Sequence, residues 1–231
     1  MSAERVLVVS AHADDEALGC GAAIRRHVDD GDRVSCISLT DGVGSRGDAK
    51  DSAAAAQRQK AADESARILG FKWIARGTFP DNVLDTIPLL EVARFVEAVK
   101  AQVRPDVIYV HHGGDLNVDH RVAFAAVVTA FRPQPHETYR EIRTFEVPSS
   151  TEWNHVSAGA AFQPTLFVDV QDTWEAKRAA LRAYEVEMRP FPHARSIEAI
   201  EALSTWRGAQ VGLPRAEAFE VVRRILRRPE S

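Results

Sequence analysis

Short apolar runs alternate with longer helical patterns through the first half of the chain. The runs Arg5 to Ser10 (RVLVVS) and Arg33 to Thr40 (RVSCISLT) contain few polar positions, which is typical of strands buried on both faces. Between them, apolar residues recur with helical spacing from Glu16 to Val28, and a turn sequence follows. The same patterns predict helices at 52–69 and 88–103 and strands at 72–75 and 106–110. Four β-α units in series predict a right-handed, mainly parallel sheet.

The second half of the chain is predicted to add strands at 142–147 and 166–170 and helices at 173–187, 196–207 and 215–227. A length of 231 residues lies within the range of one α/β domain, and no internal repeat or low-complexity linker divides the chain. We therefore expect a single domain over residues 1–231. Its expected fold is Rossmann-like α/β, with helices on both faces of the sheet and the active site at the carboxyl edge of the strands.

The composition is that of an ordinary globular protein, with 45% hydrophobic and 27% charged residues. The net charge of -4 gives no electrostatic footprint for nucleic acid, and the basic sequence RRILRR near 223–228 is interpreted as the solvated face of a last helix. No run of about 18 apolar residues is present, so we expect no transmembrane segment. Cys20 and Cys36 are too few for a disulfide framework, which favours a cytoplasmic protein. The oligomeric state is left open.

One histidine and three acidic residues directly follow the first predicted strand, in the sequence His12-Ala13-Asp14-Asp15-Glu16. In α/β folds, ligands bind at the carboxyl ends of strands, which is where this segment lies. An imidazole beside carboxylates supplies the nitrogen and oxygen ligands that suit Zn²⁺, Mn²⁺ or Fe²⁺. The segment therefore predicts a metal site.

A second cluster of His and Asp, HHGGDLNVDH at residues 111–120, follows the fourth predicted strand and precedes a helix. Loops after neighbouring parallel strands open on the same edge of the sheet, so the two clusters are expected to converge. Three protein ligands with one position left for water are typical of a catalytic zinc site. A nearby carboxylate then serves as a general base that takes a proton from water.

A plainer interpretation exists for the first cluster. Acidic residues from Asp14 to Glu16 are also what the first turn of a helix favours, because they complement the helix dipole. That interpretation does not account for His12 or for the second His/Asp cluster after another strand. We therefore favour the metal site.

The two segments together resemble the PIG-L/LmbE family of deacetylases, whose motifs read A-H-P-D-D-E and end in D-H. Here they stand as AHADDE at residues 11–16 and Asp119-His120. The resemblance is strongest over the first ~130 residues and implies one zinc ion per chain held by His12, Asp15 and His120. It implies that Asp14 is the general base and that Asp119 supports the active-site histidines or the base.

The chain departs from the family pattern at two motif positions. Ala13 replaces the usual proline, and Asn117 stands where better-known members carry a histidine that polarises the substrate carbonyl. Asn donates a hydrogen bond to an oxyanion but carries no positive charge. Asn117 is therefore one candidate for this catalytic role, and His193 is another, with His111 and His112 as further alternatives.

Other polar loops are expected to contact the substrate. The glycine-rich sequence at 40–47 offers Asp41 and Arg46, although a plain surface turn explains it equally well. Later loops offer Trp153, Arg189 and Arg195, since aromatic and hydrogen-bonding side chains are typical of sugar sites. The alternative for Trp153 is that it covers the edge of the core.

The leading hypothesis is a zinc-dependent amidohydrolase that removes an N-acyl group, above all N-acetyl, from an amino sugar or its conjugate. One alternative is a zinc hydrolase of another small amide or ester. Another is a catalytically silent metal-binding or carbohydrate-binding protein. Asp14 argues against a catalytically silent protein. A protein that only binds metal gains nothing from a carboxylate that is not a ligand, because that carboxylate repels the neighbouring acidic ligand.

Overall fold

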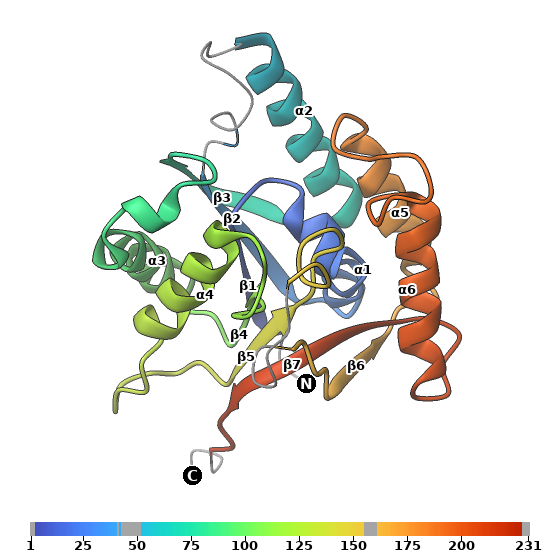
Figure 1. Cartoon of the computed structure of the whole chain (residues 1–231). Coiled ribbons are helices and arrows are strands. Elements are labelled where there is room, and N and C mark those ends of the chain that lie inside the picture. The colour runs from blue at the N-terminus through green and yellow to red at the C-terminus, as the bar shows by residue number, and fades with distance from the viewer. Residues whose placement is uncertain (1–2, 41, 43–51, 155–160, 228–231) are drawn as a thin grey trace.

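The computed structural model describes residues 3–40, 42, 52–154 and 161–227, and its strands form one seven-stranded sheet in the order β3-β2-β1-β4-β5-β7-β6 (Figure 1). The strands are β1 (Arg5–Ser10), β2 (Arg33–Thr40), β3 (Lys72–Phe79), β4 (Val107–His111), β5 (Glu141–Phe145), β6 (Leu166–Asp169) and β7 (Ala216–Arg224). The helices are α1 (Asp15–Asp29), α2 (Ser52–Leu69), η2 (Leu84–Thr86, a 3₁₀ turn), α3 (Leu89–Val103), α4 (Val118–Ala130), α5 (Trp174–Ala183) and α6 (Ile197–Ala209).

The strand order reverses between β1 and β4. From β1 the chain proceeds outward through β2 to β3, and it then returns to pair β4 with the other side of β1; all these pairings are parallel. β5 continues the parallel series, whereas β7 runs antiparallel to both of its neighbours. A crevice between two strands whose connections run in opposite directions is the usual ligand site of an open α/β sheet.

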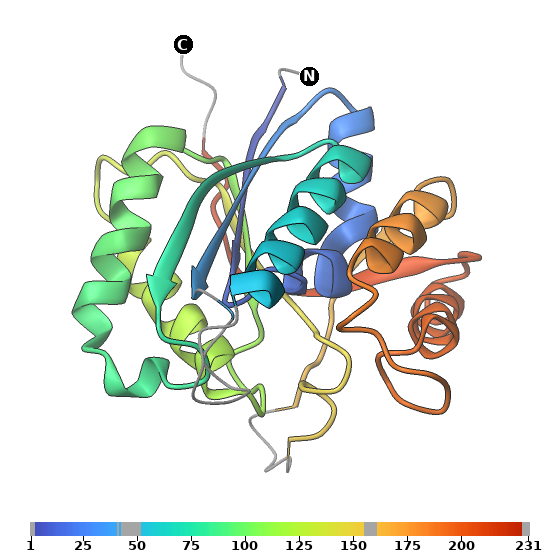
Figure 2. The same ribbon diagram turned by 90° about the horizontal axis from the view of Figure 1, so that it is seen from above.

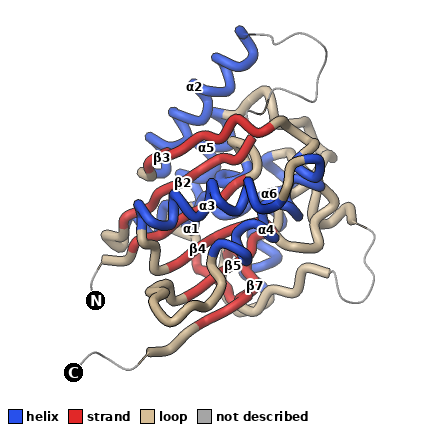
Figure 3. Tube along the Cα trace, turned by 90° about the vertical axis from the view of Figure 1, so that its left-hand side faces the viewer, coloured by secondary structure: helices blue, strands red, loops and turns tan. Residues whose placement is uncertain are grey.

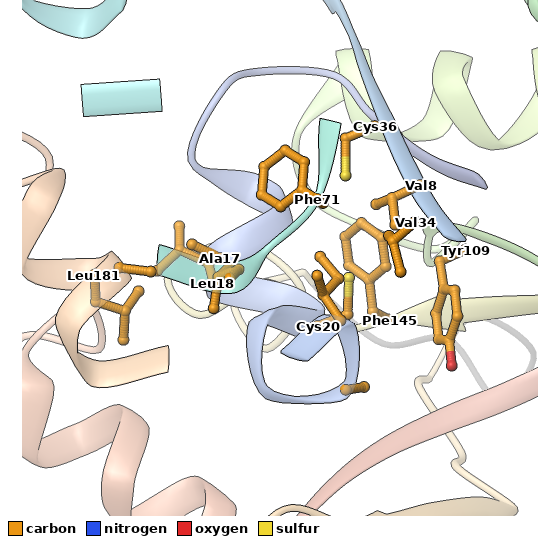
Figure 4. Packing of buried hydrophobic residues seen from close by; sticks show 14 of the residues in the cluster. Val8, Ala17, Leu18, Cys20, Val34, Cys36, Phe71, Tyr109, Phe145 and Leu181 are labelled. Carbon is orange, nitrogen blue, oxygen red and sulfur yellow. The ribbon is translucent and has the colours of Figure 1, made fainter. Parts of the chain in front are cut away.

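Helices cover both faces of the sheet, as predicted. Figure 2 shows α3 and α4 on one side and α1, α2 and α5 on the other, and Figure 3 shows the strands between the helices. Successive residues of β1 enter different clusters: Val6 and Val8 pack towards α1, and Leu7 and Val9 towards α3 and α4. Figure 4 shows Val8 in the first cluster. The unbroken apolar runs therefore correspond to strands buried on both faces, which confirms the predicted fold class.

Strand β3 is longer than predicted, so the chain leaves the sheet at a later residue than expected. The strand expected from the sequence ends at Ala75, whereas the observed strand continues to Phe79. Gly77 permits this, because a Cβ on Gly77 would lie 1.9 Å from the carbonyl oxygen of Leu39 on β2. As a result, the residues after Phe79 emerge at the carboxyl edge of the sheet.

The last predicted helix, at 215–227, is wrong: this segment contains β7. Phe219, Val221 and Val222 are aromatic or β-branched and favour strands, and the segment pairs with β5 on one side and β6 on the other. The two ladders of hydrogen bonds stabilise a strand here, although the spacing of apolar residues would also allow a helix. The basic sequence near 223–228 therefore begins at the end of a strand rather than on the solvated face of a helix.

Helix α1 is broken at Cys20, whose φ of -146° and ψ of 22° are not helical. Glu217 of β7 accepts hydrogen bonds from the backbone nitrogens of Ala22 and Ala23, at 3.1 and 2.7 Å. Lys177 of α5 donates to the carbonyl oxygen of Leu18 at 2.8 Å and to Glu217 at 2.6 Å. The Lys177–Glu217 ion pair therefore forms hydrogen bonds with backbone groups on either side of the break in α1.

None of the helices in the described ranges has the length and apolarity needed to cross a bilayer.

Candidate metal and catalytic site

The two predicted clusters converge at the carboxyl edge of the sheet, between β1 and β4. The first lies where β1 passes into α1, and the second where β4 passes into α4. Three ligand-type side chains, His12, Asp15 and His120, bring one atom each within 4.8 Å of one another. The crevice at the strand-order reversal thus contains the expected metal-binding set.

The separations within this set suit a bound cation. His12 Nδ1 lies 3.2 Å from Asp15 Oδ2, and His120 Nε2 lies 3.5 Å from Asp15 Oδ1. Two donor atoms that are each about 2 Å from a tetrahedral ion stand about 3.3 Å apart. Asp15 Oδ1 and His120 Nε2 are buried and have no hydrogen-bond partner in the described structure. A divalent cation between these atoms would give both of them a partner, so the residues fit a metal.

The ring of His12 is oriented by carboxylates on its other side. Its Nε2 lies 3.1 Å from Asp119 Oδ2 and 3.0 Å from Asp81 Oδ1. Burial opposes the charged form of His12, but its hydrogen bonds with Asp119 and Asp15 raise its pKa well above the ordinary value. Asp119 is itself held by the backbone nitrogens of Asn82 and Leu84, at 2.7 and 2.9 Å. Because both carboxylate oxygens of Asp119 already have partners, Asp119 is better placed to orient His12 than to bind a metal itself.

The ring of His120 is supported in the same way. Its Nδ1 lies 3.1 Å from Asp115 Oδ1, which leaves Nε2 directed towards Asp15. Asp115 also accepts hydrogen bonds from the hydroxyl groups of Ser150 and Thr151. Although burial opposes its charge, the hydrogen bond with His120 lowers the pKa of Asp115 to about 2. A carboxylate that fixes the tautomer of a ligating histidine is a common feature of metal sites.

Asp14 is buried beside this set but faces a different partner. Its Oδ2 accepts a hydrogen bond from Arg195 Nη1 at 3.1 Å. Its backbone has a φ of 149°, and its nitrogen donates to Glu16 Oε2 at 3.1 Å. Burial, together with the neighbouring charge of Asp15, raises the pKa of Asp14 to about 7. A buried carboxyl group with a raised pKa, carried by a strained backbone at the edge of a crevice, has the properties of a general base.

A cavity of about 420 Å³ opens beside Asp14 and His12, a size typical of small-molecule sites. Its polar lining comes from several elements: His12 and Asp14 after β1, Ser38 and Thr40 of β2, Arg58 and Gln59 of α2, Arg76 and Thr78 of β3, Asp81 and Asn82 after β3, and Asn117, Glu187 and Arg195. The cavity thus extends from the candidate metal site across β2 to β3.

Asn117 and His193, the two candidates for polarising a carbonyl, occupy different places. Asn117 lines the cavity, and its Oδ1 caps α4 by accepting from the Asp119 nitrogen at 2.8 Å. Its Nδ2 donates to Asn82 Oδ1 at 3.2 Å. His193 is not among the cavity residues; its Nδ1 accepts from the Arg195 nitrogen, and its ring packs edge-on against Trp153.

The alternatives His111 and His112 have partners outside the cavity lining. His111 Nε2 accepts from the Ala11 nitrogen at 2.8 Å, and burial lowers the pKa of His111 to about 4. His112 Nδ1 lies 2.8 Å from Glu220. Neither ring lines the cavity.

The residues expected to bind substrate are only partly brought together. Arg195 lines the cavity, but Trp153 and Arg189 do not. Arg189 donates to backbone carbonyl groups of its own loop, at Val186 and Met188. The remaining two, Asp41 and Arg46, lie outside the described residues.

From the sequence, Asp81 was not singled out as a site residue, and Glu16 was named in the first cluster without a role. Asp81 lines the cavity and contacts His12, but it follows the part of β3 that was not predicted. Glu16 accepts hydrogen bonds from Ser65 and Tyr184 at 2.9 and 2.8 Å, and thereby holds the turn that carries Asp14. Had the predicted strand extended to Phe79, the sequence would have placed Asp81 at the same edge of the sheet as the two motifs.

Comparison with known families identifies the chain. Residues 7–131, more than half of the sequence, match the family described as "PIG-L: GlcNAc-PI de-N-acetylase". The chain belongs to this family. The membership predicted from the paired motifs is confirmed, and with it the class of reaction, an amidohydrolase that acts on N-acetyl groups.

Individual relatives extend the similarity beyond the matched region. The chain is 27% identical to uncharacterized deacetylase YaiS of Escherichia coli (strain K12), over 78% of this chain and 90% of that one. It is 28% identical to diacetylchitobiose deacetylase of Thermococcus kodakarensis, over 79% of this chain and 69% of that one. The crystal structure of the conserved protein TT1542 from Thermus thermophilus superposes with a TM-score of 0.74 at 26% identity, over 99% of both chains.

Proposed function

We propose that this chain is a metal-dependent N-deacetylase of a small amino-sugar conjugate, with His12, Asp15 and His120 as the metal ligands. The observation that carries the proposal is the pair of buried atoms Asp15 Oδ1 and His120 Nε2, which lie 3.5 Å apart without hydrogen-bond partners in the described structure, next to a cavity that His12 and Asp14 line. Family membership supports the same class of reaction. Zn²⁺ is the proposed metal, with Fe²⁺ and Mn²⁺ as alternatives that the same nitrogen and oxygen ligands accept.

The proposed roles follow from where each side chain lies. When bound, the metal supplies a Lewis acid that activates water and polarises the acyl oxygen. Asp14 takes a proton from the attacking water at its carboxylate and passes a proton to the amine nitrogen as the C–N bond breaks, so acetate and a free amine result. Arg195 holds Asp14 in place through their hydrogen bond. Asp119 and Asp115 hold the two histidine rings.

Asn117 is the proposed donor to the oxygen of the tetrahedral intermediate. It lines the cavity, and an amide nitrogen has two N–H groups, of which the contact with Asn82 uses one. The other is available to a developing oxyanion. His193 lacks this support, because it does not line the cavity.

We further propose that residues 1–231 form a single domain and that the protein is cytoplasmic. One sheet contains strands from both ends of the chain, β1 and β7, which supports the first proposal. Cys20 and Cys36 are both buried as free thiols, which supports the second.

Product analysis tests the proposed function. The metal-loaded protein is incubated with a panel of N-acetylated and N-formylated amino sugars and their conjugates, and products are identified by mass spectrometry. We expect loss of an acyl group and appearance of a free amine from at least one amino-sugar conjugate. Hydrolysis of non-sugar amides or esters alone would favour the alternative zinc hydrolase, and binding without turnover would favour a silent sugar-binding protein.

A further inference from the structure

Three consecutive residues with hydroxyl groups, Ser149, Ser150 and Thr151, form a turn after β5. The backbone nitrogens of Ser150 and Thr151 donate to the carbonyl oxygen of Val147, at 3.2 and 3.0 Å. The Glu152 carboxylate accepts from the nitrogens of Ser149 and Ser150, at 2.7 and 3.3 Å, and Ser149 has a φ of 67°. None of the three is among the described residues that line the cavity, so their hydroxyl groups contact the protein itself.

Two of these hydroxyl groups hold the carboxylate that orients a candidate metal ligand. Ser150 donates to Asp115 Oδ1, and Thr151 Oγ1 donates to Asp115 Oδ2 at 2.6 Å. Because Thr151 Oγ1 also accepts from the Val147 nitrogen at 2.8 Å, its own proton is left for Asp115. Asp115 Oδ1 lies 3.1 Å from His120 Nδ1. Ser150 and Thr151 are both buried, which strengthens these hydrogen bonds.

The third hydroxyl group is connected to the proposed general base. Ser149 Oγ accepts from Arg195 Nε at 2.7 Å, and Arg195 Nη1 donates to Asp14 Oδ2 at 3.1 Å. The same turn therefore reaches two different parts of the site, the ring of a metal ligand and the carboxylate of the base. General-base catalysis requires the base and the water to be held at hydrogen-bond distance, so the relative position of these two parts matters.

We propose that residues 149–151 form a positioning turn, which fixes the general base and one metal ligand relative to each other. The hydroxyl groups of Ser150 and Thr151 act on the ring of the ligand, and that of Ser149 acts on the carboxylate of the base. The turn does not touch the substrate, so it affects metal affinity and kcat rather than KM. This inference rests on the proposed function for the roles of the ligand and the base.

Metal affinity tests the part of the proposal that concerns the ligand. The dissociation constant (Kd) for Zn²⁺ is measured without substrate, by competition with a chelator. We expect Ser150→Ala and Thr151→Val each to raise this Kd by about tenfold, since losing the groups that orient a ligating histidine typically costs about 10- to 100-fold. Thr151→Ser keeps the hydroxyl group and should stay close to the parent. Ser204→Ala is the matched control, because Ser204 is, like Ser150, 5% exposed but has no hydrogen-bond partner for its hydroxyl group in the described structure.

A double variant shows whether Ser150 acts through Asp115. Asp115→Ala removes the carboxylate and should raise the Kd for Zn²⁺ at least as much as Ser150→Ala does. Adding Ser150→Ala to Asp115→Ala should then change the Kd by less than about twofold, because the group through which the hydroxyl acts is already gone. A further tenfold loss would overturn the proposed route. Urea denaturation checks that each variant is folded; if Asp115→Ala is not, the comparison of Thr151→Val with Thr151→Ser decides.

Ser149→Gly tests the part of the proposal that concerns the base. Glycine readily adopts a positive φ, so this variant removes the hydroxyl group and keeps the turn. We expect kcat to fall by about threefold or more with KM and the Kd for Zn²⁺ unchanged, because Arg195 loses one of the two contacts that fix it. Ser149→Ala should lose kcat to a similar extent. If Ser149→Gly kept full kcat, the hydroxyl group would have no part in placing the base, which overturns the proposed connection.

Zn²⁺ binding separates this inference from the proposed function, because it needs no substrate. If the parent protein turns over no N-acyl sugar but its Kd for Zn²⁺ depends on Ser150 and Thr151 as expected, the proposed function fails and the role of the turn in holding the ligand stands. If the parent hydrolyses these sugars and no variant of residues 149–151 changes the Kd, the inference fails and the proposed function stands. A parent protein that binds no divalent metal would overturn both.

Discussion

Arg195 Nη1 donates to Asp14 Oδ2 across 3.1 Å, although the two residues are 181 positions apart in the chain. Arg195 Nε also donates to Ser149 Oγ at 2.7 Å, so the guanidinium is held from two sides. From the sequence, Arg195 is expected to bind substrate. We infer from its contact with the proposed base that Arg195 positions Asp14; because Arg195 also lines the cavity, its binding to substrate stays a prediction.

Replacing Arg195 should therefore lower turnover without removing the metal. We expect Arg195→Gln to decrease kcat by about tenfold or more, because Asp14 loses the contact that fixes its orientation towards water. Arg195→Lys should recover part of the loss. Steady-state kinetics with elemental analysis checks this, with Arg178→Gln, an arginine paired with Glu175 on the surface of α5, as the control. A rise in KM alone would return Arg195 to a substrate-binding role.

Asp14→Asn should keep the metal and lose most activity. The amide fills the same space and still faces Arg195, but it cannot accept a proton from water. Loss of a general base typically costs about 10² to 10⁴ in rate. Metal content and kcat are measured on the same preparation. If the variant loses metal but each remaining metal site turns over normally, Asp14 is a ligand and the roles of Asp14 and Asp15 must be exchanged.

Removal of a ligating ring should abolish stoichiometric metal binding. We expect about one divalent metal per chain in the parent protein and much less in His12→Ala or His120→Ala, because three protein ligands are needed to hold the ion. His136→Ala is the matched control, since the side chain of His136 is 81% exposed and His136 belongs to none of the groups among the described residues that could hold a metal ion. Elemental analysis after dialysis decides the matter. Full occupancy in both ligand variants would contradict the assignment.

Local sequence order was sufficient to predict the convergence of the two motifs. A parallel sheet brings every strand-to-helix loop to one edge, so a His/Asp cluster after the first strand and another after the fourth had to lie on the same side. The placement of His12 and His120 at this edge follows from their positions after β1 and β4, although the orientation of their rings depends on the carboxylates around them. Fold class and the grouping of candidate ligands therefore followed from pattern alone.

Other features depend on tertiary contacts that a local pattern does not contain. Arg76 and Gly77 interrupt the apolar run of β3, so its true end, and Asp81 after it, were missed. Residues 215–227 have a helical spacing of apolar positions, yet pairing with two strands makes a strand of Ala216–Arg224. For Asn117 a usable signal existed, because Asn directly before a helix is a common N-cap.

The Lys177–Glu217 pair should matter for stability more than for chemistry. Both side chains are buried, at 4% and 5% exposure, and together they bind backbone groups in the broken part of α1. Removing one partner of a buried ion pair typically costs about 3–5 kcal/mol, because the other charge is left without compensation. We expect Glu217→Gln to lower the free energy of unfolding by about this amount, measured by urea denaturation.

The double variant Lys177→Met/Glu217→Gln makes this prediction specific. With the lysine charge also removed, no uncompensated ion is buried, so the double variant should be less destabilised than the sum of the two single variants. Additive effects would show that the two side chains contribute independently. Glu175→Gln, on the exposed surface of α5, is the control and should change stability little.

The last prediction separates Asn117 from His193 as the donor to the oxyanion. A positioned donor usually contributes about 3 to 4 kcal/mol to stabilising a tetrahedral intermediate. Because Asn117 lines the cavity and His193 does not, Asn117→Ala should lower kcat by about 10² or more with metal content unchanged, and His193→Ala should have the smaller effect.

A further variant and a pH profile are needed to interpret the comparison of Asn117→Ala with His193→Ala. Asn117 also caps α4, so Asn117→Asp, which keeps a capping oxygen but has no N–H donor, distinguishes loss of the cap from loss of the oxyanion contact. Profiles of kcat against pH are recorded for all three variants. A larger loss in His193→Ala, with one limb of the profile missing, would assign the role to His193. If Asn117→Asp retained full kcat, the amide nitrogen of Asn117 would have no part in stabilising the intermediate.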